Sequence, residues 1–400
     1  DIPTHWNILK IKNLFSFSKG SGVPKSEVSD FGHSSCILYG ELYTKYKGLN
    51  LIPDTLSRTD LSKDSSVTSM GNEILIPSST TTTGIDLCNC KTLNYEDVIL
   101  GGDIIILRPE KQKISREFYS YFISTISKPQ FEMEGRGVTI YHIYPKQIRE
   151  MFVPNLPIDE QNQIVSFLDN KTQKIDNLIE KIEQKIKLLK EQRVSLINEV
   201  VSKGLNPNVE MKDSGIEWIG EIPSHWKMKR LKYLFDLVGG KDPKNVQDDN
   251  GEYPILGTGG EIDRSSDYLF DKKTILLGRK GTIDKPFLFN GPFWVSDVMY
   301  FTVPKTNMTS KYLLYLFKTF PFDLYVYGST QPSMSRLDYE GHFFPVPPIE
   351  QQQEIKDYLD EETKIIDEII SKNEKKIELL NEYKQSLISE VVTGKKRVVS

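Results

Sequence analysis

Apolar residues recur at alternating steps of three and four residues in two long stretches of the sequence. In the first, nine of the eleven positions on this spacing between 165 and 200 are apolar, and 191 residues later seven of eleven are. This spacing is typical of a coiled-coil seam. It predicts one helix over 158–201 and a second from 349 onward. The expected seam residues are Leu168, Ile175, Ile179, Ile182, Ile186, Leu189, Leu196, Leu359, Ile366, Ile370, Ile377, Leu380 and Leu387.

Outside these stretches the apolar runs are short and are bounded by Gly, Pro and Asp, which is typical of strands and turns. Helices of about three turns are expected at Glu117–Ser127 and Lys311–Phe320. The two regions read as mixed α/β heads, and the polar stretch 202–221 reads as a connector. The expected strands are Ile74–Ile76, Val98–Leu100, Ile104–Leu107, Ile275–Leu277, Phe287–Phe289 and Val298–Val303.

The chain repeats itself. Ile2-Pro3-Thr4-His5-Trp6 returns 220 residues later as Ile222-Pro223-Ser224-His225-Trp226. The openings and endings of the two long helices return at an offset of 191 residues, as Ser195–Val201 and Ser386–Val392 illustrate. The first head is therefore 29 residues longer than the second. The motifs at the ends of the repeat are similar, whereas the sequences between them have diverged.

The predicted fold class follows from this repeat: two copies of an α+β (mixed α/β) head, separated by two long antiparallel coiled-coil helices, with a pseudo-two-fold internal repeat. The expected domains are a head at 1–157, a helix with the start of the linker at 158–204, linker and head at 205–348, and a helix with the C-terminal tail at 349–400. Periodicity alone leaves a generic dimerisation coil open as an alternative.

The amino-acid composition does not indicate a nucleic-acid binder. The 400 residues carry 51 Lys and Arg against 55 Asp and Glu, and each head is close to neutral, with 17 basic and 17 acidic groups in 1–157 and 17 and 18 in 205–348. DNA affinity would therefore have to come from local patches or from partners.

The sequence has no run of apolar residues long enough to span a bilayer, so no membrane partner is expected. Its three cysteines, Cys36, Cys88 and Cys90, are too few for a disulfide framework and are expected to be buried or incidental. We therefore expect a cytoplasmic protein. Because the sequence starts at Asp1 without Met, we also expect it to be trimmed there.

No catalytic constellation is evident. The cysteines have no second Cys/His pair for zinc, the glycines do not form a phosphate loop or a dinucleotide fingerprint, and no metal site is expected. His5 and His225 stand at equivalent repeat positions beside tryptophans, which favours a packing or hydrogen-bonding role. The sequence therefore favours a non-enzymatic chain.

Several loops could contact DNA, although a solvated surface loop is the alternative for each. Gly278-Arg279-Lys280-Gly281 could project two cations from a tight turn, and a hydroxyl-rich run stands at the matching place in the first head. Arg can pair with guanine and Gln with adenine. The candidate DNA-contacting residues are Ser78, Ser79, Thr80, Arg136, Lys229, Arg230, Arg279, Lys280, Ser329, Thr330, Gln331 and Ser333.

A resemblance to a known family is carried by the duplicated head-plus-helix layout, the Ile-Pro-x-His-Trp motifs, the matching helix ends, and Ile275-Leu276-Leu277-Gly278-Arg279-Lys280-Gly281 with Gly291-Pro292-Phe293-Trp294. With these features, the sequence strongly resembles the specificity subunit of type I restriction-modification enzymes. The resemblance covers essentially the whole chain. It implies two target-recognition domains, each reading one half of an asymmetric bipartite double-stranded DNA site, and two helices that fix the gap between the half-sites.

The resemblance also implies partners. The subunit would be non-catalytic and would recruit two modification subunits, which methylate adenine with S-adenosylmethionine, and through them restriction/translocase subunits that use ATP and Mg. No cofactor is expected in this chain. Two other functions stay open: the specificity portion of a single-polypeptide or split restriction-methylation system, and a coiled-coil scaffold that binds only protein.

Overall fold

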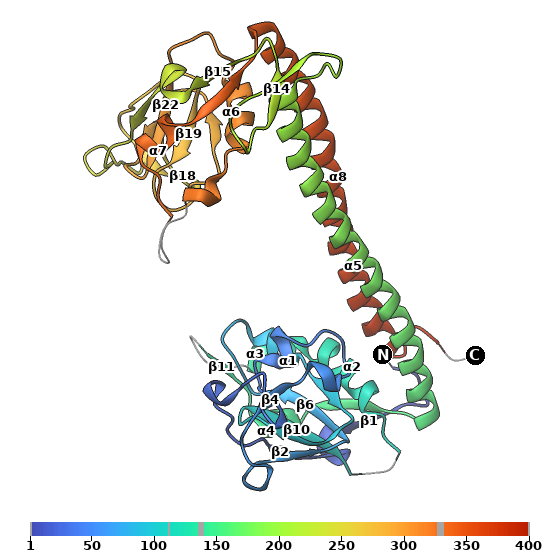
Figure 1. The fold of residues 1–400 in the computed structure, drawn as a ribbon. Helices are drawn as coiled ribbons and strands as arrows, with labels where there is room; N and C mark the ends of the chain where they lie inside the picture. The colour runs from blue at the N-terminus through green and yellow to red at the C-terminus, as the bar shows by residue number, and fades with distance from the viewer. Residues whose placement is uncertain (1, 111–112, 135–139, 326–331, 399–400) are drawn as a thin grey trace. The chain divides into compact units, whose positions relative to one another are not determined.

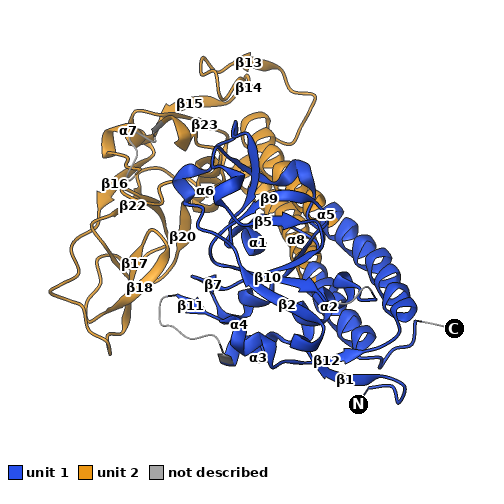
Figure 2. Cartoon of the chain, turned by 90° about the horizontal axis from the view of Figure 1, so that it is seen from below, with its two compact units in different colours: residues 1–181, 376–400 blue, residues 182–375 orange. Residues whose placement is uncertain are grey.

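The computed structural model describes residues 2–110, 113–134, 140–325 and 332–398. The chain forms two compact units: unit 1 is Asp1–Lys181 with Lys376–Ser400, and unit 2 is Ile182–Lys375 (Figure 2). Each unit combines one head with a portion of each of the two long helices (Figure 1).

The head of unit 1 is built on two four-stranded sheets. One has the order β2-β10-β6-β8 and the other β4-β3-β9-β5, and two further strand pairs are β1 with β12 and β7 with β11. The strands are β1 (Asn7–Lys10), β2 (Phe15–Lys19), β3 (Ser34–Ile37), β4 (Ser57–Thr59), β5 (Thr68–Met70), β6 (Glu73–Pro77), β7 (Ser79–Thr80), β8 (Lys91–Leu93), β9 (Glu96–Leu100), β10 (Ile104–Pro109), β11 (Tyr141–His142) and β12 (Phe152–Asn155). The short helices are α1 (Glu41–Thr44), α2 (Arg116–Ile126), α3 (Lys128–Glu134) and α4 (Pro145–Arg149).

The head of unit 2 repeats this plan with fewer strands. Its sheets have the orders β16-β22-β19-β20 and β18-β17-β21, and β15 pairs with β23 and β13 with β14. The strands are β13 (Met211–Asp213), β14 (Glu221–Pro223), β15 (Lys227–Arg230), β16 (Phe235–Gly239), β17 (Tyr253–Gly257), β18 (Gly260–Ser265), β19 (Thr274–Gly278), β20 (Phe287–Phe289), β21 (Trp294–Val295), β22 (Met299–Pro304) and β23 (Phe343–Val346). The short helices are α6 (Ser310–Lys318) and α7 (Arg336–Glu340).

The two heads share one topology. In each, the second sheet contains a parallel pair, β3 with β9 and β17 with β21, next to an antiparallel neighbour. All six strands and both short helices expected from the apolar runs are present, with ends that differ by a few residues. The predicted mixed α/β repeat is therefore confirmed.

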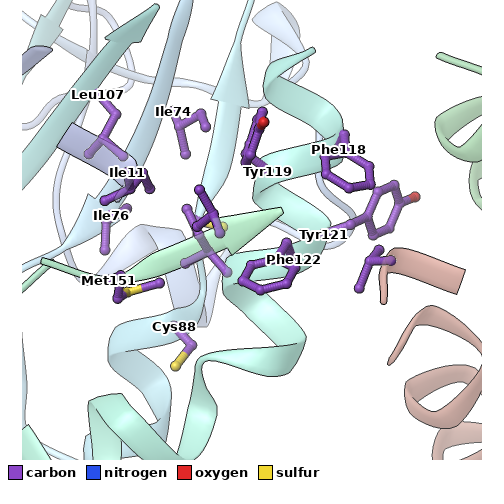
Figure 3. Close-up of a cluster of buried hydrophobic side chains, with 14 of the residues drawn as sticks. Ile11, Ile74, Ile76, Cys88, Leu107, Phe118, Tyr119, Tyr121, Phe122 and Met151 are labelled. Atoms are coloured by element: carbon purple, nitrogen blue, oxygen red, sulfur yellow. The ribbon is translucent and has the colours of Figure 1, made fainter. Parts of the chain in front are cut away.

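The core of unit 1 lies between the first sheet and helix α2. Every residue of β6 is buried. Because this inner strand is covered on both faces, its sequence is a nearly continuous apolar run. Figure 3 shows Ile74, Ile76 and Leu107 on one side of this core and the aromatic side chains of α2 on the other. The N-cap of helix α2 is Ser115, whose hydroxyl accepts a hydrogen bond from the Phe118 amide at 3.3 Å.

The long helices are α5 (Ile158–Lys203) and α8 (Ile349–Val392). Within unit 2 they run antiparallel, because Lys190 and Arg193 of α5 meet Glu374 and Asp367 of α8 in reversed order. Each helix is followed by a glycine with positive φ, Gly204 at 74° and Gly394 at 71°, the conformation that ends helices. The predicted antiparallel coil is confirmed.

Candidate nucleic-acid interface

The cationic turn of unit 2 follows β19 and is anchored by main-chain hydrogen bonds on both sides. The Arg279 amide donates to the Val298 carbonyl at 2.8 Å, and the Met334 amide donates to the Arg279 carbonyl at 2.9 Å. Gly281 has a φ of 84°, which permits the tight reversal after the two cations. The main chain of the turn is therefore held in place on both sides.

The two cations of this turn point outward. Arg279 and Lys280 are both exposed. The Arg279 guanidinium lies 6.0 Å from the centre of the Tyr300 ring, and its Nη1 donates to the Asp297 carbonyl at 3.3 Å. A guanidinium oriented in this way keeps further N–H donors for a phosphate or a guanine edge.

Ser333 lies beside the cationic turn. It forms an isolated antiparallel bridge with Lys280, and its side chain is exposed. The structure thus brings together three of the residues selected from the sequence: Arg279, Lys280 and Ser333. Four others, Arg136, Ser329, Thr330 and Gln331, lie outside the described residues.

The equivalent turn of unit 1 has the opposite character. Ser78, Ser79 and Thr80 are at most 2% exposed. Residues 79 and 80 form strand β7, which pairs with β11, and the Ser79 hydroxyl lies 2.8 Å from Nδ1 of His142. These hydroxyl groups form internal hydrogen bonds and present almost no surface to a ligand, so their assignment to DNA contact stays a prediction that the burial does not favour.

Lys229 and Arg230 lie on β15 in unit 2. Arg230 is exposed, with its guanidinium 4.9 Å from the centre of the Phe343 ring, and Lys229 is half-buried. In unit 1 the corresponding cation is Lys10, which pairs with Glu150 at 2.7 Å, and Lys12 pairs with the same carboxylate at 2.6 Å. These hydrogen bonds lower the pKa of Glu150 to about 2.

All thirteen seam residues are shielded from solvent. Leu168, Ile175, Ile182, Ile186, Leu359, Ile366, Ile370 and Leu387 are buried, and Ile179, Leu189, Leu196, Ile377 and Leu380 are half-buried. The two polar residues that interrupt the seam at equivalent positions, Arg193 and Lys384, each pair with an aspartate of the opposite helix. Arg193 meets Asp367 at 2.9 Å in unit 2, and Lys384 meets Asp176 at 2.6 Å in unit 1.

Buried tyrosines explain the second polar pair in the seam. In unit 1 the Tyr121 hydroxyl donates to Asp169 at 2.7 Å and lies 3.4 Å from Thr172. In unit 2 Tyr315 makes the same contacts with Asp360 at 2.6 Å and with Thr363 at 3.4 Å. Sequence reasoning missed these partners, although the recurrence of threonine at an offset of 191 was a usable signal.

The start of each long helix is held by a matched pair of aromatic residues. Trp6 Nε1 donates to Glu160 at 3.1 Å, and Trp226 Nε1 donates to Gln351 at 2.8 Å. His5 and His225 lie 3.1 Å from the same two side chains, which agrees with the hydrogen-bonding role expected of them. The two motifs therefore fasten the heads to the helices.

The cysteines are buried, as expected. Burial raises the pKa of Cys36 and of Cys90 to about 11, so both stay protonated thiols near neutral pH. In the described part of the chain, no group of three or more His, Cys, Asp or Glu side chains could hold a metal ion. None of the described helices is long and apolar enough to cross a membrane.

Comparison with known proteins places these features in a family. Residues 3–188 and 223–379 match the model of the type I restriction modification DNA specificity domain. The putative type I restriction enzyme MjaX specificity subunit of Methanocaldococcus jannaschii is 24% identical over 326 residues, which cover 76% of this chain and 73% of that protein. The MjaVIII specificity subunit of the same organism is 23% identical over 328 residues, 72% of each chain.

Solved structures resemble the fold. A chain from a study of complex assembly and conformational transition of the type I R-M system aligns with a TM-score of 0.79 at 14% identity, covering 99% of this chain and all of that one. The HsdS subunit from Thermoanaerobacter tengcongensis aligns with a TM-score of 0.55 at 13% identity, covering 99% and 98%. At these identities the likeness concerns the fold alone.

Proposed function

The chain belongs to the type I restriction modification DNA specificity family, and from that premise we propose that each unit reads one half of a split DNA target. The observation that carries this proposal is the match of the family model to both heads, combined with their divergence at equivalent turns. The two heads keep the same arrangement of sheets and the same attachment to the helices. They differ where a DNA reader would need to differ, because two half-sites of an asymmetric target require different contacts.

In unit 2 we propose that Arg279, Lys280 and Ser333 form part of the DNA contact. Their exposure and the main-chain anchoring of the turn support this role, since a preorganised guanidinium loses little freedom on binding. In unit 1 the contact must come from other side chains if Ser78, Ser79 and Thr80 keep their buried positions.

We also propose that the two long helices set the spacer between the half-sites and recruit two modification subunits. The seam binds the helices to one another, which leaves their outer faces for partners. Leu188 and Leu379 stand at equivalent repeat positions on those faces and are 64% and 51% exposed. An apolar residue repeated in this way suits two copies of one partner.

The chemistry would then belong to the partners. We propose that this chain is non-catalytic, that S-adenosylmethionine binds the modification subunits and that ATP with Mg binds the restriction subunits. A cytoplasmic location fits such a complex. A scaffold that binds only protein is disfavoured, because the family is defined by DNA specificity.

The test is a domain exchange. Residues 1–157 are replaced by the corresponding head of a family member with a different target, and the methylated sequences are read from genomic DNA of cells that also produce the modification partner. The expected result is a new motif in which one half has changed and the other half and the spacer have not. A change in both halves, or no split adenine motif that depends on this gene, contradicts the proposal.

A further inference from the structure

Strand β1 of unit 1 and strand β15 of unit 2 lie in the same main-chain environment, so positions around them can be compared one to one. The Ile11 amide donates to the Met151 carbonyl and the Leu231 amide to the His342 carbonyl, both at 2.9 Å. The preceding residues, Glu150 and Gly341, are therefore equivalent. In the same way the amides of Glu110 and Lys305 donate to equivalent leucine carbonyls at 2.9 Å.

In unit 1 the two lysines at β1 and just after it are paired with a carboxylate. Lys10 and Lys12 both pair with the Glu150 carboxylate, and Glu110 is exposed nearby on the chain that leaves β10. Because the Glu150 pKa is lowered to about 2, this carboxylate stays ionised throughout the pH range in which proteins are handled. The two ammonium groups therefore have a permanent partner.

In unit 2 the same positions are strongly cationic. Asn7, Leu9, Lys10, Lys12, Ser16, Glu110 and Glu150 correspond to Lys227, Lys229, Arg230, Lys232, Asp236, Lys305 and Gly341, so the formal charge of these seven positions is 0 in unit 1 and +4 in unit 2. Including the next equivalent pair, Arg149 and Glu340, changes the two sums to +1 and +3. A glycine replaces the carboxylate that holds the two lysines of unit 1. Among the described residues, no ion pair involves Lys227, Lys229, Arg230 or Lys232.

The carboxylates near this surface already have partners. Asp236 pairs with Lys305 at 2.6 Å, and Glu340 pairs with Arg336 at 2.5 Å. Two of the remaining cations lie over aromatic rings: the Arg230 guanidinium over Phe343, and the Lys232 ammonium 5.1 Å from the centre of the Tyr233 ring. Contact with a ring orients a cation and leaves its N–H groups available to an anion.

We propose that β15 and the turn that follows it (Leu231–Tyr233) bind DNA phosphates in unit 2, and that Glu150 prevents the equivalent surface of unit 1 from doing so. This inference rests on the proposed function and adds an asymmetry to it: unit 2 supplies a sequence-independent anchor that unit 1 lacks. Arg and Lys contacts to phosphates hold a protein on the duplex without reading sequence. DNA is the favoured polyanion because the family binds it, and an acidic protein surface is the competing outcome of the test.

The experiment measures binding of the full chain to a random-sequence DNA duplex at several salt concentrations, because phosphate contacts appear in the slope of log K against log salt. Replacing Arg230 and Lys232 together by Ala removes two phosphate contacts, and the slope is expected to become shallower by about 1.8, at about 0.9 for each phosphate. The matched control is Lys10→Ala with Lys12→Ala, at the equivalent positions of unit 1. That control should leave the slope unchanged, because both lysines are already paired with Glu150 and are not available to phosphates.

A gain-of-function variant keeps the test independent of misfolding. Glu150→Gln releases Lys10 and Lys12, and the slope should steepen by up to about 1.8. The inference is overturned if the unit 2 variant leaves the slope unchanged, if the unit 1 control changes it equally, or if Glu150→Gln has no effect. Loss of assembly with the modification subunits at an unchanged slope would assign the surface to an acidic protein instead. The methylated motif of the domain exchange does not enter this measurement, so the proposed function can stand or fall separately.

Discussion

Units 1 and 2 have the same frame and different surfaces. In both, a Trp-His pair fastens the head to the start of a helix, a tyrosine bonds an Asp-Thr pair in the seam, and a basic residue crosses to an aspartate of the opposite helix. Directly after the equivalent strands β6 and β19, unit 1 buries Ser78, Ser79 and Thr80 where unit 2 exposes Arg279 and Lys280. This difference indicates that the interior contacts preserve the fold, while the surface loops can diverge without changing it.

The largest expected effect distinguishes the role of the helices, which is to set the spacer, from that of the heads, which is to read the half-sites. Inserting four residues into α5 near Lys190 and four into α8 near Glu374, which faces Lys190, lengthens both helices by about 6 Å, at roughly 1.5 Å per residue. The preferred spacer should then grow by about two base pairs, because DNA rises about 3.4 Å per base pair. Sequencing of methylated sites should show both half-sites unchanged, and an unchanged spacer would reject the role of the helices.

Inserting a turn into α5 alone is the matched control. It displaces Arg193 from Asp367 while α8 keeps its length. We expect this variant to unfold at a lower temperature and to yield no new defined spacer. Equal behaviour of the single and double insertions would show that the pairing of the helices is unimportant.

Next in size is the cost of cavities at equivalent seam positions. Leu168 and Leu359 are both 0% exposed. Changing either to Ala should lower the free energy of unfolding by about 2–5 kcal/mol, measured by denaturant titration. Leu188→Ala, on an exposed face, should change it by less than about 0.5 kcal/mol. Clearly unequal costs at 168 and 359 would show that the frames of the two units differ.

A smaller effect tests the two turns. Arg279→Ala should weaken binding to a duplex carrying the target by about 1–3 kcal/mol and relax the preference only in the half-site read by unit 2. Ser79→Ala removes a buried partner of His142, so we expect it to lower stability and not half-site preference. If Ser79→Ala changed sequence preference without lowering stability, the contrast between the turns would be wrong.

The smallest effect concerns Glu150 and pH. The pKa of its carboxyl is lowered from 4.5 to about 2, so its pairing with the two lysines is complete above about pH 4.5 and is lost as the pH falls toward 2. The stability difference between the wild type and Glu150→Gln should therefore shrink over that range. A carboxyl carbon resonance of Glu150 that titrates near pH 4.5 would show that the ion pairs of Glu150 with Lys10 and Lys12 do not form in solution.

Much of the fold could be predicted from the sequence because the signals are periodic or repeated. The sequence predicted the first long helix to within two residues and the start of the second, and the offsets of 220 and 191 predicted two related heads. The exposed pair Arg279 and Lys280 was also predictable, since a charged turn between apolar strands is almost always solvated.

The remaining features of the candidate interface depend on contacts between residues far apart in the chain. The hydroxyl-rich run that begins at Ser78 reads as a flexible polar loop, yet pairing with residues more than 60 positions later buries its first half, Ser78–Thr80, while residues 81–83 are exposed. Likewise, Lys10 and Lys12 resemble Arg230 and Lys232 in sequence, but a carboxylate about 140 residues away forms ion pairs only with Lys10 and Lys12.

The sequence by itself determined the repeat, the two helices, the mixed character of the heads and the family. These follow from local periodicity and from self-similarity, which need no knowledge of how distant segments meet. Only the tertiary structure decided which polar residues are internal partners and which face solvent. Burial and charge neutralisation arise from distant segments brought together by folding, and a linear pattern does not record those encounters.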